Sequence, residues 1–148
     1  MSRIRTMAAA ATLALSAPLA QAAQEPPLVV VEKSPSCGCC TGWVEHMRAE
    51  GFEVEARDVS PDQLDRTKAA LGITSETMSC HTAMVGAYVI EGHVPAADVR
   101  RLLDAAPEAL GLAAPGMPAA SPGMDVGTEP YDVLLIDEDG ATSVFATH

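Results

Sequence analysis

The chain has 148 residues, of which 20 are acidic and 9 are Lys or Arg, so its formal net charge is −11 at pH 7. This length fits a single domain with its own hydrophobic core. The negative charge argues against a nucleic-acid binder, which needs a basic surface for phosphates, and against adhesion to an anionic membrane. It leaves cationic partners open, metal ions among them.

The first 22 residues have the three-part pattern of a secretory signal peptide. Arg3 and Arg5 precede a short Ala/Leu-rich stretch, and the small residues Ala20 and Ala22 stand at positions −3 and −1 of a cleavage site. The apolar stretch is shorter than the roughly 20 residues that a membrane-spanning helix needs. We therefore predict a signal peptide at residues 1–22, a single domain at residues 23–148, and export to the periplasm.

The rest of the chain alternates strand and helix patterns. Strands are predicted at 28–33 and 52–59, a strand pair at 83–91, helices at 41–50, 61–71 and 95–106, and a C-terminal β-hairpin at 131–137 and 142–146. The Pro- and Gly-rich segment 107–128 shows little regular pattern. The order β-α-β-α-β-β-α predicts an α/β fold of the thioredoxin-like kind, with a central mixed β-sheet flanked by helices.

Three of the four cysteines fall within the run Cys37-Gly38-Cys39-Cys40, between the first predicted strand and the first predicted helix. Cysteines so close together have poor geometry for structural disulfides, so the cluster indicates a site rather than a framework. The dipole and the free amides at a helix N-terminus favour the thiolate form.

Three interpretations of the cysteines stay open at this point. The thiolates could bind a soft metal ion such as Cu(I), or Cys37 and Cys40 could exchange disulfides, with Cys37 as the nucleophile. Alternatively, two disulfides such as Cys37–Cys40 and Cys39–Cys80 could brace the fold. In a thioredoxin-like fold, the loop before the third strand faces the reactive pair and normally carries a proline. Here that loop carries Cys80 and His81 instead, which favours a sulfur-lined metal pocket.

For His81 and two of the methionines, a role in metal binding and a purely structural role both stay open. His81 either binds a metal beside Cys80 or turns away to cap a carbonyl. A repeated Pro-Gly-Met motif places Met117 and Met124 in a loop, where their thioethers either reach over the sulfur cluster or fill an apolar gap. Of the other histidines, His46 is expected on the surface, His93 in a turn and His148 in the terminal tail.

These motifs together resemble the CopG-type family, a family of exported metal-binding proteins found with bacterial copper-resistance genes. The segments that carry the resemblance are 36–40 with Trp43, 78–83, 91–95, 111–112, 115–118 and 121–124. The resemblance implies a thioredoxin-like fold, a periplasmic location and a role in copper redox handling. It implies Cu(I) bound by Cys37, Cys39, Cys40 and Cys80, with His81, Met117 and Met124 as neighbours.

Four thiolates can bridge several Cu(I) ions, so a polynuclear site is expected. Copper ions and other periplasmic copper-resistance proteins are the expected partners.

Overall fold

The computed structural model describes residues 27–148, and the predicted signal peptide at residues 1–22 lies outside them. The elements follow in the order β1 (Leu28–Lys33), α1 (Gly38–Ala49), β2 (Glu53–Asp58), α2 (Pro61–Ala70), β3 (His81–Val85), β4 (Tyr88–Gly92), α3 (Ala96–Ala105), β5 (Gly111–Ala114), β6 (Asp132–Ile136) and β7 (Thr142–Thr147). Among the described residues, no helix is both long enough and apolar enough to cross a bilayer.

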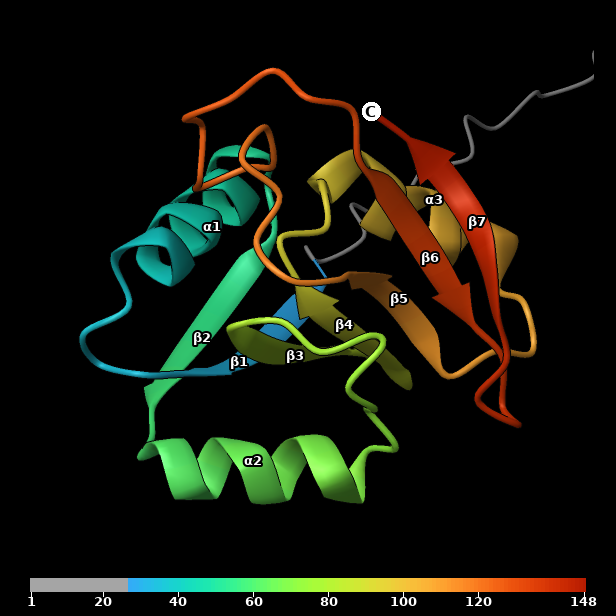
Figure 1. Ribbon diagram of the computed structural model, residues 1–148, viewed down its shortest axis with the longest axis horizontal. Helices are drawn as coiled ribbons and strands as arrows, with labels where there is room; N and C mark the ends of the chain where they lie inside the picture. The colour runs from blue at the N-terminus through green and yellow to red at the C-terminus, as the bar shows by residue number, and fades with distance from the viewer. Residues whose placement is uncertain (1–26) are drawn as a thin grey trace, which may run out of the picture.

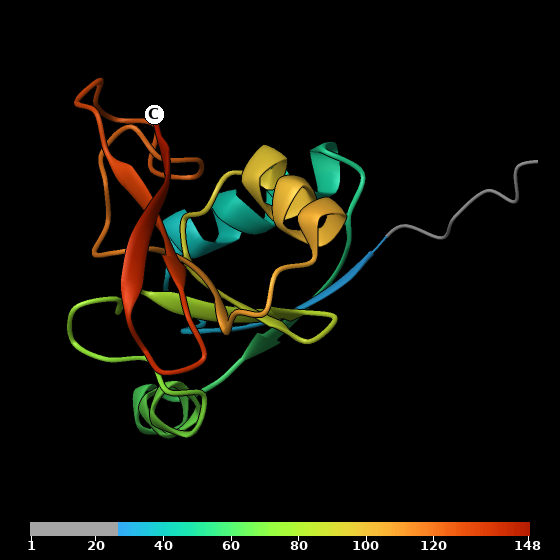
Figure 2. The ribbon, with the colours of Figure 1, turned by 90° about the vertical axis from the view of Figure 1, so that its right-hand side faces the viewer.

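One seven-stranded mixed sheet organises the molecule, with the strand order β2-β1-β3-β4-β5-β6-β7 (Figure 1). The β1–β2 and β4–β5 pairs are parallel, and the other four pairs are antiparallel. Helices α1 and α3 cover one face of the sheet and α2 covers the other (Figure 2). The predicted α/β class, the mixed sheet flanked by helices and the C-terminal hairpin are therefore confirmed.

The main hydrophobic core lies between the sheet and the helices α1 and α3. Trp43 and Met47 of α1 and Leu102 of α3 are fully buried there, against Val31 of β1 and Ile90 of β4. Burial of each such side chain contributes about 1.5–3 kcal/mol, so this core anchors α1 firmly on the sheet. A smaller cluster, which includes Ile73 and Val89, lies on the opposite face.

The antiparallel register brings three chain segments to one edge of the sheet. Lys33, at the end of β1, pairs with His81, at the start of β3. Thr82 pairs in turn with Glu91 near the end of β4. The turn that leads into α1, the loop that precedes β3 and the residues that follow β4 therefore meet at this edge.

Strand β5 lies within the segment that the sequence predicted to be irregular, so that prediction is wrong for Gly111–Ala114. These four residues are buried between β4 and β6. A Cβ atom on Gly111 would lie only 1.8 Å from the Val89 carbonyl oxygen, so only glycine fits the strand there. The strand thus depends on tertiary packing, because its Gly-Leu-Ala-Ala sequence has little β-propensity.

Candidate metal centre

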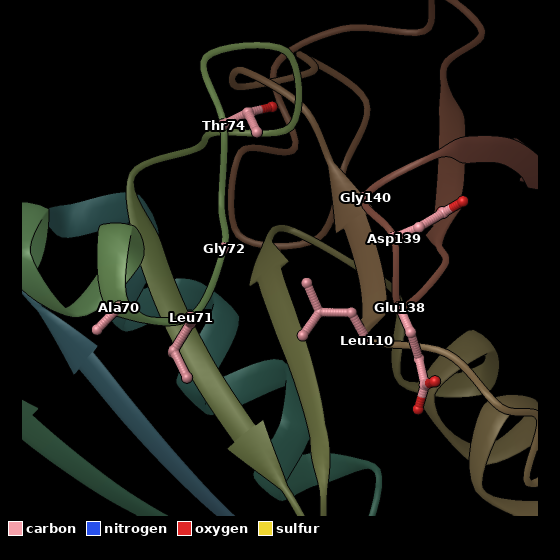
Figure 3. A pocket seen from close by; sticks show the side chains of 8 residues that line it. All are labelled: Ala70, Leu71, Gly72, Thr74, Leu110, Glu138, Asp139 and Gly140. Atoms are coloured by element: carbon pink, nitrogen blue, oxygen red, sulfur yellow. The ribbon is translucent and has the colours of Figure 1, made fainter.

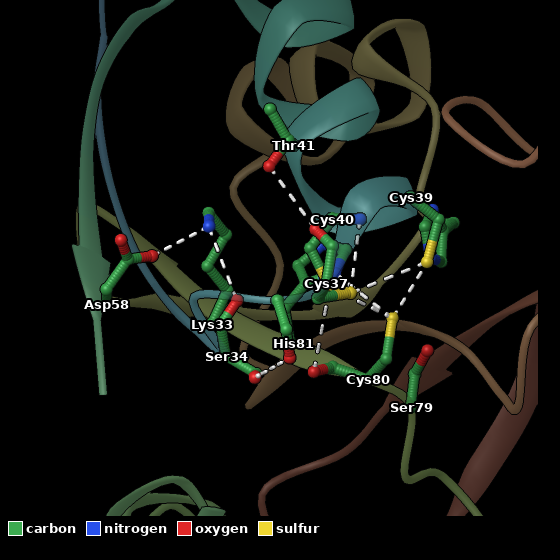
Figure 4. Close-up of a disulfide and its surroundings, with 12 residues drawn as sticks. Lys33, Ser34, Cys37, Cys39, Cys40, Thr41, Asp58, Ser79, Cys80 and His81 are labelled. Carbon is green, nitrogen blue, oxygen red and sulfur yellow. Dashed lines mark hydrogen bonds and ion pairs between the residues drawn. A yellow bond between two sulfur atoms is a disulfide. The ribbon is translucent and has the colours of Figure 1, made fainter. Parts of the chain in front are cut away.

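Three cysteines lie in the first turn of α1. Cys37 is the N-cap residue, and its Sγ accepts a hydrogen bond of 3.3 Å from the Cys40 amide. Cys37 and Cys40 form a disulfide, whereas Cys39 carries a free thiol whose Sγ lies 3.5 Å from Cys37 Sγ. The helix therefore presents one disulfide and one thiol to the same edge of the sheet (Figure 4).

Cys80 adds the fourth sulfur from a segment forty positions further along the chain. Its Sγ lies 3.4 Å from Cys40 Sγ, and the four sulfur atoms all lie within 4.8 Å of one another. The predicted meeting of Cys80 with the other three cysteines is thus confirmed. Of the two disulfides in the bracing interpretation, Cys37–Cys40 is present, whereas Cys39 and Cys80 are both free thiols in this structure.

Burial, together with the negative charge of a Cys39 thiolate, raises the pKa of the Cys80 thiol to about 11. Cys80 is therefore a neutral thiol at pH 7 in the absence of a cation. A bound metal ion favours the thiolate over the neutral thiol, because the ion binds the thiolate and the proton is released.

His81 lies directly beside this thiol. Its Nδ1 is 3.5 Å from Cys80 Sγ, and its ring, which is fully buried, packs on Trp43 with the ring centroids 4.6 Å apart. Burial lowers the pKa of His81 well below its ordinary value, with a further lowering from nearby positive charges. Its Nε2 has no hydrogen-bond partner within residues 27–148. Of the two predicted orientations, the structure therefore shows the one in which the imidazole borders Cys80.

His93 is the residue that the sequence interpretation missed. The prediction made it a turn residue and gave it no place in the site, but the side chain is fully buried and its Nε2 lies 3.0 Å from Cys80 Sγ. Its Nδ1 lies 2.8 Å from the Pro122 carbonyl oxygen, and only a protonated Nδ1 can donate to that acceptor. The lone pair is then on Nε2, which faces the thiol, and burial lowers the pKa of the ring. The position was recoverable, because the β3–β4 hairpin brings the residue after β4 back to the start of β3.

Cys80, His81 and His93 form a second group whose ligand atoms lie within 4.8 Å of one another. This group shares Cys80 with the four-sulfur group. The site therefore offers sulfur ligands on the side of α1 and imidazole nitrogens on the side of β3 and β4. Thiolates and neutral imidazoles are the ligands that soft and borderline metal ions prefer.

The loop that carries Met117 and Met124 borders the site. Gly116 forms an isolated parallel bridge with Ser79, and a Cβ atom on Gly123 would lie 2.6 Å from the Cys39 carbonyl oxygen. Met117 is 56% exposed and Met124 is half-buried. The loop is thus anchored against both cysteine segments, and metal binding by either thioether stays a prediction.

The remaining two histidines have structural contacts that the sequence did not indicate. His46 was expected on the surface, but it is half-buried and its Nε2 accepts a hydrogen bond of 3.1 Å from the Ala96 amide at the start of α3. The prediction for His46 is therefore corrected. His148 is exposed after β7, as expected, and its Nε2 lies 2.6 Å from an Asp98 carboxylate oxygen while its ring stacks on Tyr131.

A separate hollow of about 420 Å³ lies between the end of α2 and the β6–β7 turn (Figure 3). Its lining includes Leu71, Leu110 and Asp139 and shares no residue with the cysteine site.

Comparison with known proteins places the site in a family. A family model described as "Protein of unknown function, DUF411" matches residues 77–124, and no curated protein matches the chain. A solved structure described as copper resistance protein CopG, form 1, is 37% identical, with a TM-score of 0.78, and the match covers 84% of this chain and 98% of that one. The chain belongs to the CopG copper-resistance family. The form 2 structure of CopG is 39% identical, with a TM-score of 0.77 and coverage of 84% and 99%.

Proposed function

We propose that this CopG-family protein binds Cu(I) in its reduced form, with Cys37, Cys39, Cys40 and Cys80 as thiolate ligands. The observation that carries the proposal is the convergence of four sulfur atoms within 4.8 Å from two distant chain segments. Clustered thiolates select soft ions, and four of them can bridge several Cu(I) ions. The copper-resistance relatives support copper as the ion.

Two of these ligands become available only after the Cys37–Cys40 disulfide is reduced. A dithiol reductant supplies two electrons and two protons, becomes a disulfide itself, and leaves two cysteine thiols on α1. Each thiol then gives up its proton as it binds the metal. Copper binding and the redox state of the protein are therefore linked, which suits a role in copper redox handling.

The histidines and the methionine loop would complete the copper site. His93 Nε2 and His81 are placed to bind an ion that also contacts Cys80. The parallel bridge between Ser79 and Gly116 puts Met117 next in register to Cys80, so that its thioether suits an exchangeable outer ligand. Met124 would act in the same way from the other end of the loop.

The cellular setting follows from the same proposal. The pattern at residues 1–22 supports export to the periplasm, where copper and other copper-resistance proteins would be its partners. The strand order β2-β1-β3-β4, with β3 antiparallel to its neighbours, supports a thioredoxin-like core to which β5–β7 are added.

Anaerobic titration with Cu(I) tests the proposal. The reduced protein should develop Cu(I)–thiolate absorption and lose free thiols as copper is added, whereas the oxidised protein should bind far less copper. Cys80→Ser should lower the Cu(I) affinity. Ser36→Ala should leave it unchanged, because the Ser36 hydroxyl has a hydrogen bond only with Ser34 among the described residues. Absence of Cu(I)–thiolate absorption in the reduced protein would contradict the proposal.

A second function, thiol–disulfide exchange, is favoured by one observation: the Cys37–Cys40 disulfide lies at a helix N-terminus, where a leaving thiolate is stabilised. Reduction of insulin disulfides without copper, inactivated by Cys37→Ser but unaffected by Cys80→Ser, would support this function. Activity that requires bound copper, or no activity at all, would contradict it.

A further inference from the structure

A buried polar network lies behind the cysteine site, on the face of the sheet that α2 covers. Glu91 of β4 is fully buried, and its Oε1 accepts hydrogen bonds from Lys68 Nζ at 2.5 Å and from the Ser79 amide at 2.6 Å. Its Oε2 accepts from Thr82 Oγ1 at 2.6 Å. The carboxylate therefore joins α2, β3 and β4 to the loop residue that directly precedes Cys80.

Ser79 is fixed at two further points. Its hydroxyl donates to the Gly116 carbonyl oxygen, and its backbone forms the bridge with Gly116. Its side chain also packs tightly on Gly92, where an added Cβ atom would lie 2.3 Å from Ser79 Oγ. Of these contacts, the one to Glu91 comes from a fully buried carboxyl group, and a buried polar group that loses its partner is costly to the fold.

We propose that Glu91, held in place by its contact with Lys68, is a positioning residue that fixes Cys80 in the sulfur cluster by accepting the hydrogen bond of the Ser79 amide. The cysteine next to Ser79 has its Sγ 3.4 Å from Cys40 Sγ, so a displaced Ser79 carries Cys80 away from α1. The effect on copper rests on the proposed function, whereas the effect on sulfur geometry does not.

The first test uses no copper. In a Cys37→Ser, Cys39→Ser background, only Cys40 and Cys80 remain, and their disulfide equilibrium in a glutathione buffer measures how closely the two thiols are held. Lys68→Met with Glu91→Leu removes both charges and leaves the Ser79 amide without its acceptor. Lys68→Met with Glu91→Gln also removes both charges but keeps an amide oxygen for it. We expect the disulfide equilibrium constant to fall at least about tenfold in the first pair and less than about threefold in the second.

Asp58→Asn serves as the matched control, since it removes another Lys–carboxylate pair of the same sheet, Lys33–Asp58, which makes no contact with Ser79. It should leave the disulfide equilibrium unchanged. The proposal would be overturned if the double variant with Glu91→Leu (the Leu pair) and the one with Glu91→Gln (the Gln pair) lowered the disulfide equilibrium constant equally. It would also be overturned if Asp58→Asn lowered this constant as much as the Leu pair does.

Amide hydrogen exchange in the unmodified protein keeps the proposal testable if the Leu pair does not fold. The Ser79 amide should exchange slowly although the residue is only half-buried. Exchange at the rate of an open loop would overturn the proposal.

The second test measures Cu(I) affinity in proteins that have either Cys or Ser at position 80. The Leu pair should weaken Cu(I) binding at least about tenfold when Cys80 is present and have no further effect in Cys80→Ser, because its action passes through that thiol. The same loss in both backgrounds would overturn the positioning role. Absence of Cu(I) binding in every protein would refute only the proposed function, since the disulfide equilibrium reports on Glu91 without copper.

Discussion

The two halves of the sulfur cluster are held in different ways. Cys37, Cys39 and Cys40 sit on a single helical turn, and the N-cap contact and the disulfide that fix them are both local in the sequence. Ser79, the residue before Cys80, contacts Glu91 of β4 and Gly116 of the loop after β5, and both of these are brought to it only by the folded sheet. The helical half should therefore tolerate change, whereas the Cys80 half should depend on the whole fold.

A pair of glycine substitutions should show the largest difference between the halves. At Gly92, φ is +72° and a Cβ atom would lie 2.3 Å from Ser79 Oγ and 2.8 Å from the Ala114 carbonyl oxygen. Gly92→Ala should lower the free energy of unfolding by about 2–4 kcal/mol and displace the segment before Cys80. Gly38, in the helical half, has no atom within 4 Å of an added Cβ.

Gly38→Ala should accordingly be neutral, or stabilising by up to about 1 kcal/mol. Urea denaturation of both variants measures the difference. A Gly92→Ala protein as stable as Gly38→Ala would mean that the Cys80 half is not tightly packed.

Reduction of the Cys37–Cys40 disulfide should have a smaller effect. It closes a loop within one helical turn, and the loop-closure model assigns so short a loop about 2 kcal/mol. We expect the reduced protein to stay folded with its free energy of unfolding lowered by about this amount, as measured by denaturation with and without a dithiol. Unfolding on reduction would instead support the interpretation of the disulfide as a structural brace.

What could be predicted from the sequence follows the same division. The strand β1 and helix α2 were predicted closely, because the Val-rich run and the Ser60-Pro61 start are local signals. The spacing of the cysteine run likewise predicted that its sulfur atoms gather, and the structure brings them together. The meeting with Cys80 was predicted because the order of the elements implied which loop faces the first helix.

The predictions failed where burial comes from distant strands. Nothing local to Gly92-His93 indicates a buried imidazole, because its burial and its Pro122 contact depend on the register of β3 with β4 and on the path of the 115–130 loop. Strand β5 was missed for the same reason, since its residues are buried by β4 and β6 rather than marked by their own pattern.

Substitutions of His93, beside Cys80, and of His46, on α1, compare the two halves within the proposed copper site. His93→Gln removes the imidazole that faces Cys80 Sγ at 3.0 Å, and it should lower Cu(I) affinity at least about tenfold, which corresponds to about 1.4 kcal/mol. His46→Gln, on α1, changes an imidazole that contacts the Ala96 amide and should leave the affinity within about twofold. Competition with a Cu(I) chelator measures both. Equal affinities for the two variants would place His93 outside the copper site.

Tyr131 offers a test by pH, at the far end of the loop that borders the site. Burial, together with the negative charges of Asp98 and Asp125, raises its pKa from 10.0 to about 12. Since the folded state favours the neutral phenol, this contribution to stability is complete below pH 10 and is lost as the pH rises through 12. We expect wild-type protein to lose stability between pH 10 and 12 relative to Tyr131→Phe, with the difference constant below pH 10. Ultraviolet titration of the phenol in a Tyr88→Phe background should give the same high pKa. Ionisation near pH 10 would contradict the effect of burial on Tyr131.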